Sequence, residues 1–235
     1  SLEAAGVRCL RHDPPRAAQA AGFVSLDEAL AADIVSLHVP LTAGGDHPTV
    51  GLVGARQLGV MRPGALLINA ARGGVVDEAA WLRAIADGRL TAVVDCWAGE
   101  PVVSPALLAA AWIATPHIAG HTIDARQRAT RQLRDALAAW QAGRGAPPVP
   151  AWHSAAGAAP TPLRLDMGGT WAAAGSAVRA CCDPLAQTAL MRAAIGAGEA
   201  GAFDRLRGQF GQRREFGIRP VALPGAAPDT SGLLQ

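Results

Sequence analysis

The sequence of 235 residues contains no tyrosine and no lysine, and only 4% of its residues are aromatic. Apart from histidine its basic side chains are therefore all arginine, and the net charge at pH 7 is only +2. So small a positive excess argues against nucleic acid or an anionic membrane as a partner. No apolar run approaches the roughly 20 residues that a membrane-spanning helix needs. Residues 1–10 lack the basic and apolar regions of a signal peptide, so we expect a cytoplasmic protein.

Cysteine is scarce as well. The four cysteines, which form no C-x-x-C pair, are Cys9, Cys96, Cys181 and Cys182. Adjacent cysteines such as the last two are poorly placed for an ordinary disulfide. The pattern is typical of a protein in a reducing compartment, and it predicts neither a zinc site nor a disulfide-stabilised secreted domain.

What the chain does contain, as far as about residue 141, is a regular alternation of short apolar runs with segments of helical periodicity. The runs predict strands and the periodic segments predict helices between them. The predicted strands are 7–10, 33–40, 65–71, 91–97 and 112–116. The predicted helices are 25–30, 54–61, 77–88 and a long helix after Thr122. Strands that are apolar on both faces and separated by helices indicate an α/β fold with a Rossmann-like parallel sheet covered on both sides.

The composition changes at about residue 143, where a stretch rich in proline, glycine and alanine begins. We expect a first domain over 1–141, a linker over 142–162, a small α+β domain over 163–223 and a loose tail over 224–235. The predicted elements of the second domain are helices in 183–195 and 202–210 and a final strand in 217–223. Because this domain is small for an independent core, it is expected to pack on the first domain or on another copy of itself.

Two loops at predicted strand ends carry charged residues of functional interest. Asp13 follows the first strand, where the acid of a dinucleotide-binding fold accepts hydrogen bonds from the adenosine ribose. An aspartate before two prolines is as often only a turn former. After the strand that ends at Asn69, Arg72 lies among small residues that let a ligand approach the backbone. Its planar fork can grip a carboxylate through two parallel hydrogen bonds, although a lone arginine is also a common surface charge.

Two carboxylates and a histidine follow the last two predicted strands. Asp95 ends one strand, Glu100 follows it five residues on, and His117 lies where the last strand gives way to a helix. A carboxylate beside a histidine favours the imidazolium, and a histidine with its ordinary pKa near ~6.5 can move protons at neutral pH. The alternative roles are capping or exposure to water for the two carboxylates, and capping or packing for the histidine.

Taken in order, the patterns N-x-x-R-G, D-x-x-x-x-E-P and P-H-x-A-G resemble the D-isomer-specific 2-hydroxyacid dehydrogenases. The stretches DPPR, W-x-GEP, TPHIAG, VRACCDP and RREF are most similar to members that oxidise a phosphorylated 2-hydroxy acid in pyridoxal 5′-phosphate (vitamin B6) biosynthesis. This likeness covers nearly all of residues 1–221. It implies NAD-dependent hydride transfer and a homodimer formed through the C-terminal domain. An aspartate rather than an arginine at position 13 favours NAD over NADP.

The resemblance also implies roles for individual residues. Arg72 would orient the substrate carboxylate, His117 would take the proton from the C2 hydroxyl, and Glu100 would stabilise the charged form of His117. Asp95 would bind the nicotinamide carboxamide and Asp13 the ribose. The other residues expected to line the cofactor, together with Arg72, are Val39, Ala70, Ala71 and Gly120.

The chain departs from the family pattern at three places. His121 stands where the family usually has a tyrosine that contacts substrate, and its ring can still reach a phosphate. Val39 stands where the family often has a threonine that contacts NAD, and it has no hydroxyl to offer. No predicted strand is followed by the G-x-G-x-x-G loop that seats a pyrophosphate on a helix N-terminus. The likeness begins at the helix after that loop, so we expect a fragment of a longer chain.

Other interpretations stay open. One is a different D-2-hydroxyacid dehydrogenase, and another is a nucleotide-sensing corepressor of the same fold, in which dimerisation and partner contact replace turnover. A third is an inactive remnant, which the truncation and His121 favour. The presence of Arg72, Glu100 and His117 together argues against that third interpretation. Arg213 and Arg214 are candidates either for binding a substrate phosphate across a dimer interface or for structural ion pairs.

Overall fold

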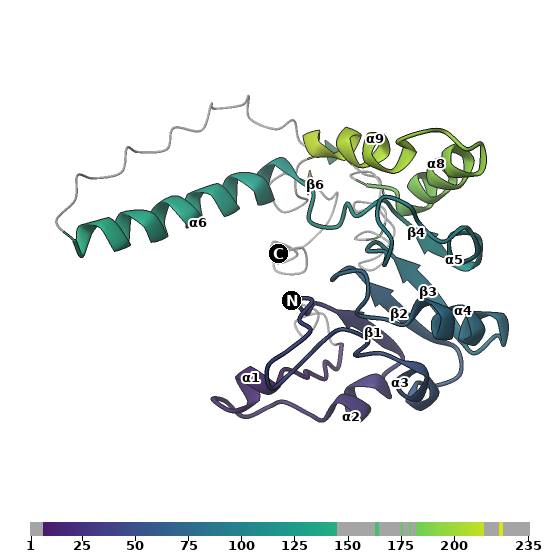
Figure 1. Cartoon of the computed structure of the whole chain (residues 1–235), viewed down its shortest axis with the longest axis horizontal. Helices are drawn as coiled ribbons and strands as arrows, with labels where there is room; N and C mark the ends of the chain where they lie inside the picture. Colours follow the sequence, from purple (N-terminus) through teal and green to yellow (C-terminus); the bar gives the residue numbers. More distant parts are fainter. Residues whose placement is uncertain are drawn as a thin grey trace. The chain divides into compact units, whose positions relative to one another are not determined.

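The computed structural model describes residues 7–144, 163–164, 175, 179, 182–213 and 221–222. The chain divides into two compact units. One is made of Leu2–Ala119 and Asp183–Gly208, and the other of Ser1, Gly120–Cys182 and Gln209–Gln235. The first unit holds the sheet that positions the predicted site, and the second holds the long helix α6 (Figure 1).

Four parallel strands form the sheet of the first unit, in the order β1-β2-β3-β4. Their bounds are Ile34–Leu37 for β1, Ala65–Asn69 for β2, Leu90–Val94 for β3 and Ile113–Ala114 for β4. The strands end level, because Leu37 pairs with Asn69, Asn69 with Val94, and Val94 with Ala114. The loops that leave the four carboxyl ends therefore start from one edge of the sheet, as the sequence pattern predicted.

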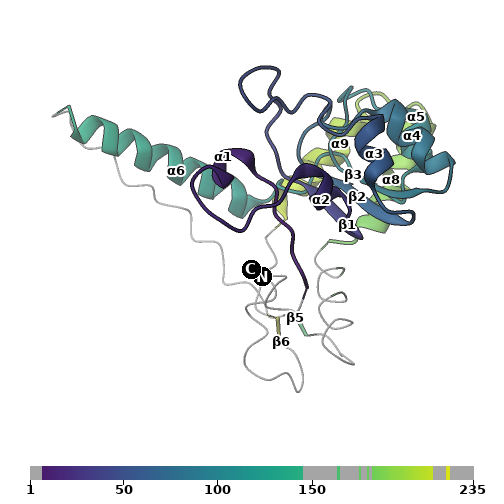
Figure 2. The same cartoon turned by 90° about the horizontal axis from the view of Figure 1, so that it is seen from below.

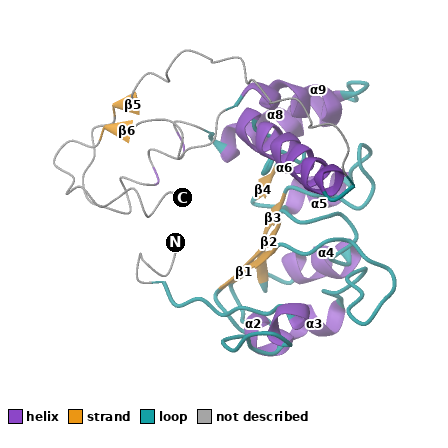
Figure 3. Cartoon of the chain, turned by 90° about the vertical axis from the view of Figure 1, so that its left-hand side faces the viewer, coloured by secondary structure: helices purple, strands orange, loops and turns teal. Residues whose placement is uncertain are grey.

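One face of the sheet is buried and the other is only partly covered. Connecting helices α3 (Ala55–Val60), α4 (Glu78–Ala86) and α5 (Pro105–Ala110) lie side by side (Figure 2) and on one side of the strands (Figure 3). On the opposite face Leu66, Ile68 and Val93 are half-buried, and Ile34 is 62% exposed. The prediction that both faces are covered is thus wrong for the described residues, because all three connections run over the same face.

The helix starts follow local capping signals. Ser25 caps α2 (Leu26–Leu30) by accepting a hydrogen bond from the Glu28 amide at 3.2 Å, and Asp77 caps α4 in the same way. Both starts were predicted. The helix α5, capped by Ser104, was not predicted, although Ser-Pro before a run of alanine and leucine is a helix-start signal.

The first predicted strand is absent. Residues 7–10 have no regular structure, and no described strand pairs with them. An extended segment without a partner strand leaves its backbone groups to water, so the apolar run alone does not make a strand. Asp13, placed in the loop after that strand, instead caps the short helix α1 (Pro14–Ala17).

Two helices from the far end of the sequence complete the first unit. They are α8 (Pro184–Gly196) and α9 (Ala202–Gln209), and both were predicted. The hydroxyl of Thr188 on α8 accepts a hydrogen bond from the Ala114 amide of β4 at 2.9 Å. Arg192 donates to carbonyl groups at the end of α5, among them Leu108 O at 3.0 Å. The helix α8 therefore stabilises β4 and the end of α5 through these hydrogen bonds.

The turn from α8 to α9, Gly196–Gly201, has the spacing G-x-G-x-x-G. It follows a helix rather than a strand, so it is not the phosphate loop of a dinucleotide-binding fold. Gly198 and Gly201 have φ values of 70° and 64°, a left-handed conformation that glycine adopts without strain.

The second unit holds α6 (Ile123–Ala142), which Thr122 caps, and a short parallel pair, β5 (Leu163–Arg164) with β6 (Val221–Ala222). The large apolar side chains Leu133, Leu137 and Trp140 of α6 are on the surface, and Leu133 is 74% exposed. The η2 turn follows α9 at Phe210–Gln212. Within the described parts of the chain, no helix has the length and apolar character needed to cross a membrane. Most of the predicted linker, part of the predicted C-terminal domain, the tail and Arg214 lie outside the described residues, so the predicted division into domains stays a prediction.

Candidate active site

Asn69, the last residue of β2, joins two of the loops at the carboxyl edge. Its side-chain amide donates to Arg72 O at 3.1 Å and to Cys96 O at 3.2 Å. Its side-chain oxygen accepts from the Ala71 amide at 3.2 Å. The loop after β2, which carries Arg72, is thereby tied to the loop after β3, which carries Glu100.

Gly73 brings the same two loops into direct contact. A Cβ atom at this position would lie 1.8 Å from Trp97 O and 2.8 Å from the Ala98 amide nitrogen. No side chain fits there without moving the backbone of the neighbouring loop. The glycine of the R-G pattern is therefore required by close packing of the backbone, and its own φ is not left-handed.

Asp95 holds the loop that follows β4. This buried carboxylate accepts hydrogen bonds from the Thr115 hydroxyl at 2.6 Å and from the amides of Ile118 at 2.7 Å and Ala119 at 3.0 Å. Its backbone carbonyl also accepts from the His117 amide at 2.9 Å. Asp95 thus fixes the segment on both sides of the histidine.

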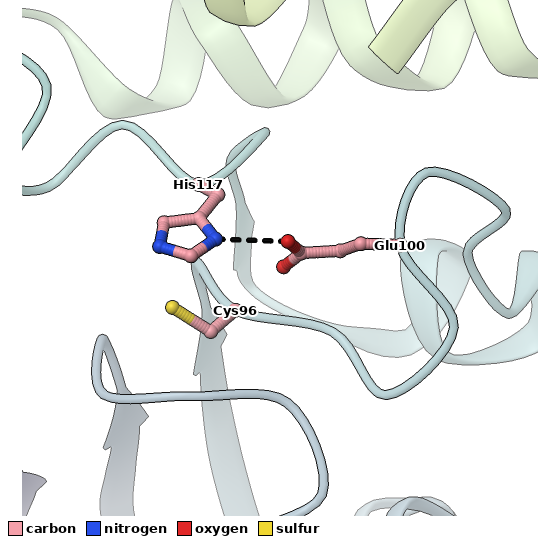
Figure 4. Close-up of side chains that lie close together, drawn as sticks. All are labelled: Cys96, Glu100 and His117. Atoms are coloured by element: carbon pink, nitrogen blue, oxygen red, sulfur yellow. Dashed lines mark hydrogen bonds and ion pairs between the residues drawn. The ribbon is translucent and has the colours of Figure 1, made fainter. Parts of the chain in front are cut away.

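His117 and Glu100 form the central pair of the site. The ring atom Nδ1 lies 2.8 Å from Glu100 Oε2, and both side chains are 23% exposed (Figure 4). Glu100 Oε1 accepts from the Trp97 amide at 2.8 Å, which orients the carboxylate. An ionised carboxylate can only accept, so Nδ1 carries the hydrogen and Nε2 of the neutral ring is left as an acceptor.

The backbone of His117 is unusual. Its φ of 54° makes it the only non-glycine residue with a positive φ among the described residues. Such a conformation persists where surrounding contacts hold it, and it is frequent at functional sites. One of those contacts comes from α9, where Arg207 Nε donates to His117 O at 3.2 Å.

Cys96 is a third side chain of the site. It is buried, and its sulfur lies within 4.8 Å of ligand atoms of Glu100 and His117 (Figure 4). Burial, followed by the charges of Asp95 and Glu100, raises the pKa of this thiol to about 12. The charges of Arg72 and Arg207 act in the opposite direction, which places two guanidinium groups near the same thiol.

Arg72 keeps most of its hydrogen-bonding capacity for other groups. One nitrogen, Nη1, donates to Ala71 O at 2.7 Å, and the residue is exposed. Since a guanidinium has five N–H donors in a planar fork, several remain for an anion.

A family model for the NAD binding domain of the D-isomer specific 2-hydroxyacid dehydrogenases matches residues 1–119. The chain belongs to this family. Among curated relatives, it is 38% identical over 239 residues to an erythronate-4-phosphate dehydrogenase of Pseudomonas putida, covering 99% of this chain and 63% of the relative. It is 42% identical over 237 residues to the enzyme of that name from Azotobacter vinelandii, covering 97% and 61%. The chain therefore spans about three-fifths of the length of the curated relatives it matches. Among solved structures, the chain is similar to a glyoxylate reductase from Paecilomyes thermophila, with 32% identity and a TM-score of 0.45. The match covers 56% of this chain and 39% of the reductase.

The residues predicted to line NAD lie in different surroundings. Val39 is half-buried after β1 and packs on the core, and Ala70 and Ala71 follow β2. Gly120 belongs to the other compact unit. The structure gives Asp13 a local role, because its carboxylate accepts from the Arg16 amide at 3.1 Å. Its predicted contact with ribose stays a prediction.

His121 also belongs to the second unit, whereas His117 and Glu100 belong to the first. Its Nε2 lies 3.3 Å from the position that a Cβ of Gly211 would take, close to the guanidinium of Arg126. Its predicted contact with substrate stays a prediction.

Sequence reasoning missed Cys96 and Arg207 as site residues. Cys96 directly follows Asp95, and this adjacency was a signal that could have found it. Arg207 offered none, because it lies 90 residues after His117 on an ordinary amphipathic helix.

Proposed function

We propose that the chain is the NAD-binding and proton-transferring part of a dehydrogenase that oxidises 4-phospho-D-erythronate to 3-hydroxy-2-oxo-4-phosphobutanoate, a step of pyridoxal 5′-phosphate biosynthesis. The observation that carries the proposal is the 2.8 Å hydrogen bond between His117 and Glu100 at the carboxyl edge of a parallel sheet. The names of the relatives support the choice of substrate. Arg72 supplies a cation for an acidic substrate. Its charge and the charge of Glu100 both act on the pKa of the Cys96 thiol.

In this reaction the C2–H bond breaks and the C2–O bond becomes a carbonyl. His117 Nε2 accepts the proton of the C2 hydroxyl, and Glu100 stabilises the imidazolium that forms. The free N–H groups of Arg72 bind the substrate carboxylate and orient C2. NAD, when bound, supplies the acceptor for the hydride that leaves C2.

The residues at the carboxyl edge fit the nicotinamide end of that cofactor. Ala70 and Ala71 are small, and Val39 adds an apolar side chain after β1. Asp95 Oδ2 accepts one hydrogen bond from Ala119, which leaves it capacity for the amide of a carboxamide. We assign Asp13 to the ribose and Gly120 to the cofactor on the resemblance alone.

We further propose a cytoplasmic homodimer that forms through the C-terminal domain. The exposed apolar row on α6, which includes Leu133, Leu137 and Trp140, supports association with another surface. Cys9 and Cys96 are not in disulfides, which supports a reducing compartment. Within this proposal we retain the division into an NAD-binding domain, a linker, a dimerisation domain and a tail.

The proposal is tested by replacing His117 with asparagine, which tolerates a left-handed backbone better than alanine does. We expect His117→Asn to lower turnover of 4-phosphoerythronate by about 10²- to 10⁴-fold, the usual contribution of an acid/base group. Binding of NADH, followed by energy transfer from tryptophan, should change little. The exposed His47 provides the matched control, His47→Asn, which should behave like the wild type.

Two results would contradict the proposal. Wild-type turnover in His117→Asn would show that this residue does not move the proton. A wild type that binds NADH but does not oxidise 4-phosphoerythronate, while it oxidises another D-2-hydroxy acid, would replace the proposed substrate.

A further inference from the structure

Arg207 lies on α9, far from the patterns that define the site, yet it contacts the central histidine. Its Nε donates to His117 O at 3.2 Å across a separation of 90 residues. Arg207 and His117 belong to the same compact unit. The side chain is half-buried.

This contact completes a set of hydrogen bonds around the strained backbone of His117. The amide of His117 donates to Asp95 O at 2.9 Å, and its carbonyl accepts from Arg207. Both polar groups of the residue are thereby held while its φ is 54°. The direction in which the imidazole ring points depends on this backbone conformation, so Arg207 acts on the orientation of the ring.

Most of the guanidinium remains available after this contact. Neither Nη atom of Arg207 makes a hydrogen bond with a described residue, and no carboxylate of the described chain lies within ion-pair distance of it. The two nearby carboxylates are engaged elsewhere, Glu100 with His117 and Asp95 with the loop after β4. Among the described residues, the charge of Arg207 is therefore not neutralised by a partner of its own.

A second guanidinium near the histidine matches the charge pattern of the proposed substrate. That molecule carries a carboxylate next to C2 and a phosphate at the other end of a four-carbon chain. Arg72, from the loop after β2, accounts for one anionic group. Arg207 contacts the backbone of His117, and the charges of Arg72 and Arg207 both lower the pKa of the Cys96 thiol. Arginine binds phosphate oxygens through parallel hydrogen bonds.

We propose that Arg207 binds the phosphate of the substrate through its Nη groups while its Nε positions His117. The inference rests on the proposed function and deepens it, because it assigns the residue that distinguishes a phosphorylated 2-hydroxy acid from an unphosphorylated one.

The test compares binding of 4-phosphoerythronate and D-erythronate, measured by calorimetry in the presence of NADH, so that no turnover is needed. We expect the wild type to bind the phosphorylated acid at least tenfold more tightly. Arg207→Gln should weaken binding of 4-phosphoerythronate by about 10- to 100-fold, as for loss of a charged hydrogen bond. Binding of D-erythronate should differ by less than about threefold between the wild type and Arg207→Gln, because this substrate has no phosphate for Arg207 to contact.

Two further variants separate phosphate binding from general damage. Arg205→Gln removes a neighbouring arginine of α9 that is already paired with Glu199, and it should leave both affinities unchanged. Arg207→Lys keeps the charge without the fork, so it should recover part of the phosphate affinity. With Arg207→Lys the turnover number should be lower than that of the wild type for both substrates, because the bond to His117 O is lost.

The outcomes distinguish this inference from the proposed function. Arg207→Gln that binds 4-phosphoerythronate as tightly as the wild type overturns the assignment, even if the wild type is an active dehydrogenase. A variant that loses turnover equally on both substrates, with unchanged affinities, also overturns the phosphate contact. Wild-type protein that does not prefer the phosphorylated acid contradicts both the assignment and the proposed substrate, while the His117→Asn experiment still tests the proton transfer.

Discussion

Replacing Gly73 with alanine is the most direct test of how the site is assembled. The new Cβ would lie 1.8 Å from Trp97 O and 2.3 Å from Trp97 C, whereas non-bonded carbon contacts are favourable at about 3.5 Å. The two loops would have to separate by roughly 1.5 Å to relieve this overlap. The obstacle is backbone, so no rotation of a side chain can remove it.

The loop that would have to move is anchored at several points. Trp97 Nε1 donates to Thr115 O at 3.0 Å, and the Trp97 amide donates to Glu100 at 2.8 Å. Overpacking of a well-packed region costs about 1–3 kcal/mol, and we expect Gly73→Ala at or above the upper end, about 3 kcal/mol. For a chain of this size that loss corresponds to a decrease in Tm of about 6–12 °C. Displacement of Glu100 should also lower turnover.

Urea unfolding followed by far-UV circular dichroism measures the loss, with Gly59→Ala as the matched control. Gly59 lies inside α3, and a Cβ there would meet nothing within 4 Å. The control should be neutral or more stable by about 0.5–1 kcal/mol, because alanine is favoured over glycine within a helix. If Gly73→Ala unfolds at the same urea concentration as the wild type, the close packing of the two loops does not contribute as argued.

Two further substitutions test buried groups. Thr188→Val removes a buried hydroxyl that accepts a hydrogen bond from Ala114 N and donates one to Pro184 O. This change should lower the free energy of unfolding by about 1–3 kcal/mol. Thr188→Ser keeps the hydroxyl, so it should lose less stability in the same urea experiment. The pKa of Cys96 is raised from 9.0 to about 12, so between these pH values the unfolded chain loses a proton that the folded chain keeps. Stability contributed by the neutral thiol should therefore be present below pH 9 and be lost as the pH rises toward 12. Urea midpoints measured at pH 8 and pH 10.5 should fall further for the wild type than for Cys96→Ala, and equal falls would contradict the raised pKa.

The site was predictable to the extent that it depends on strand ends. Arg72, Glu100 and His117 follow separate apolar runs, and parallel strands that end level bring such loops to one edge. The caps at Ser25 and Asp77 were predictable because they depend on a few neighbouring residues. These features are local or follow from a repeated pattern.

Features that depend on a distant partner were not predictable. The apolar run at 7–10 reads as a strand, but whether it becomes one depends on another strand to pair with. Asp95 was assigned to a cofactor, and the structure shows that its carboxylate also holds the loop around His117. Arg207 reaches His117 only because α9 lies beside the loop that follows β4, and no pattern near either residue encodes that contact.

The hydrogen bond from Ala114 to Thr188 has a consequence for the solubility of incomplete chains. β4 is the last strand of the described sheet, and a strand at that position offers unpaired backbone groups to strands of other molecules. Here a side chain from α8 occupies one of those groups, and the helix itself lies against the strand. During synthesis, that protection arrives only after 74 further residues have been added beyond Ala114. Until then the growing chain carries an open template for intermolecular pairing, so a product that stops before α8 would expose the surface on which aggregation begins.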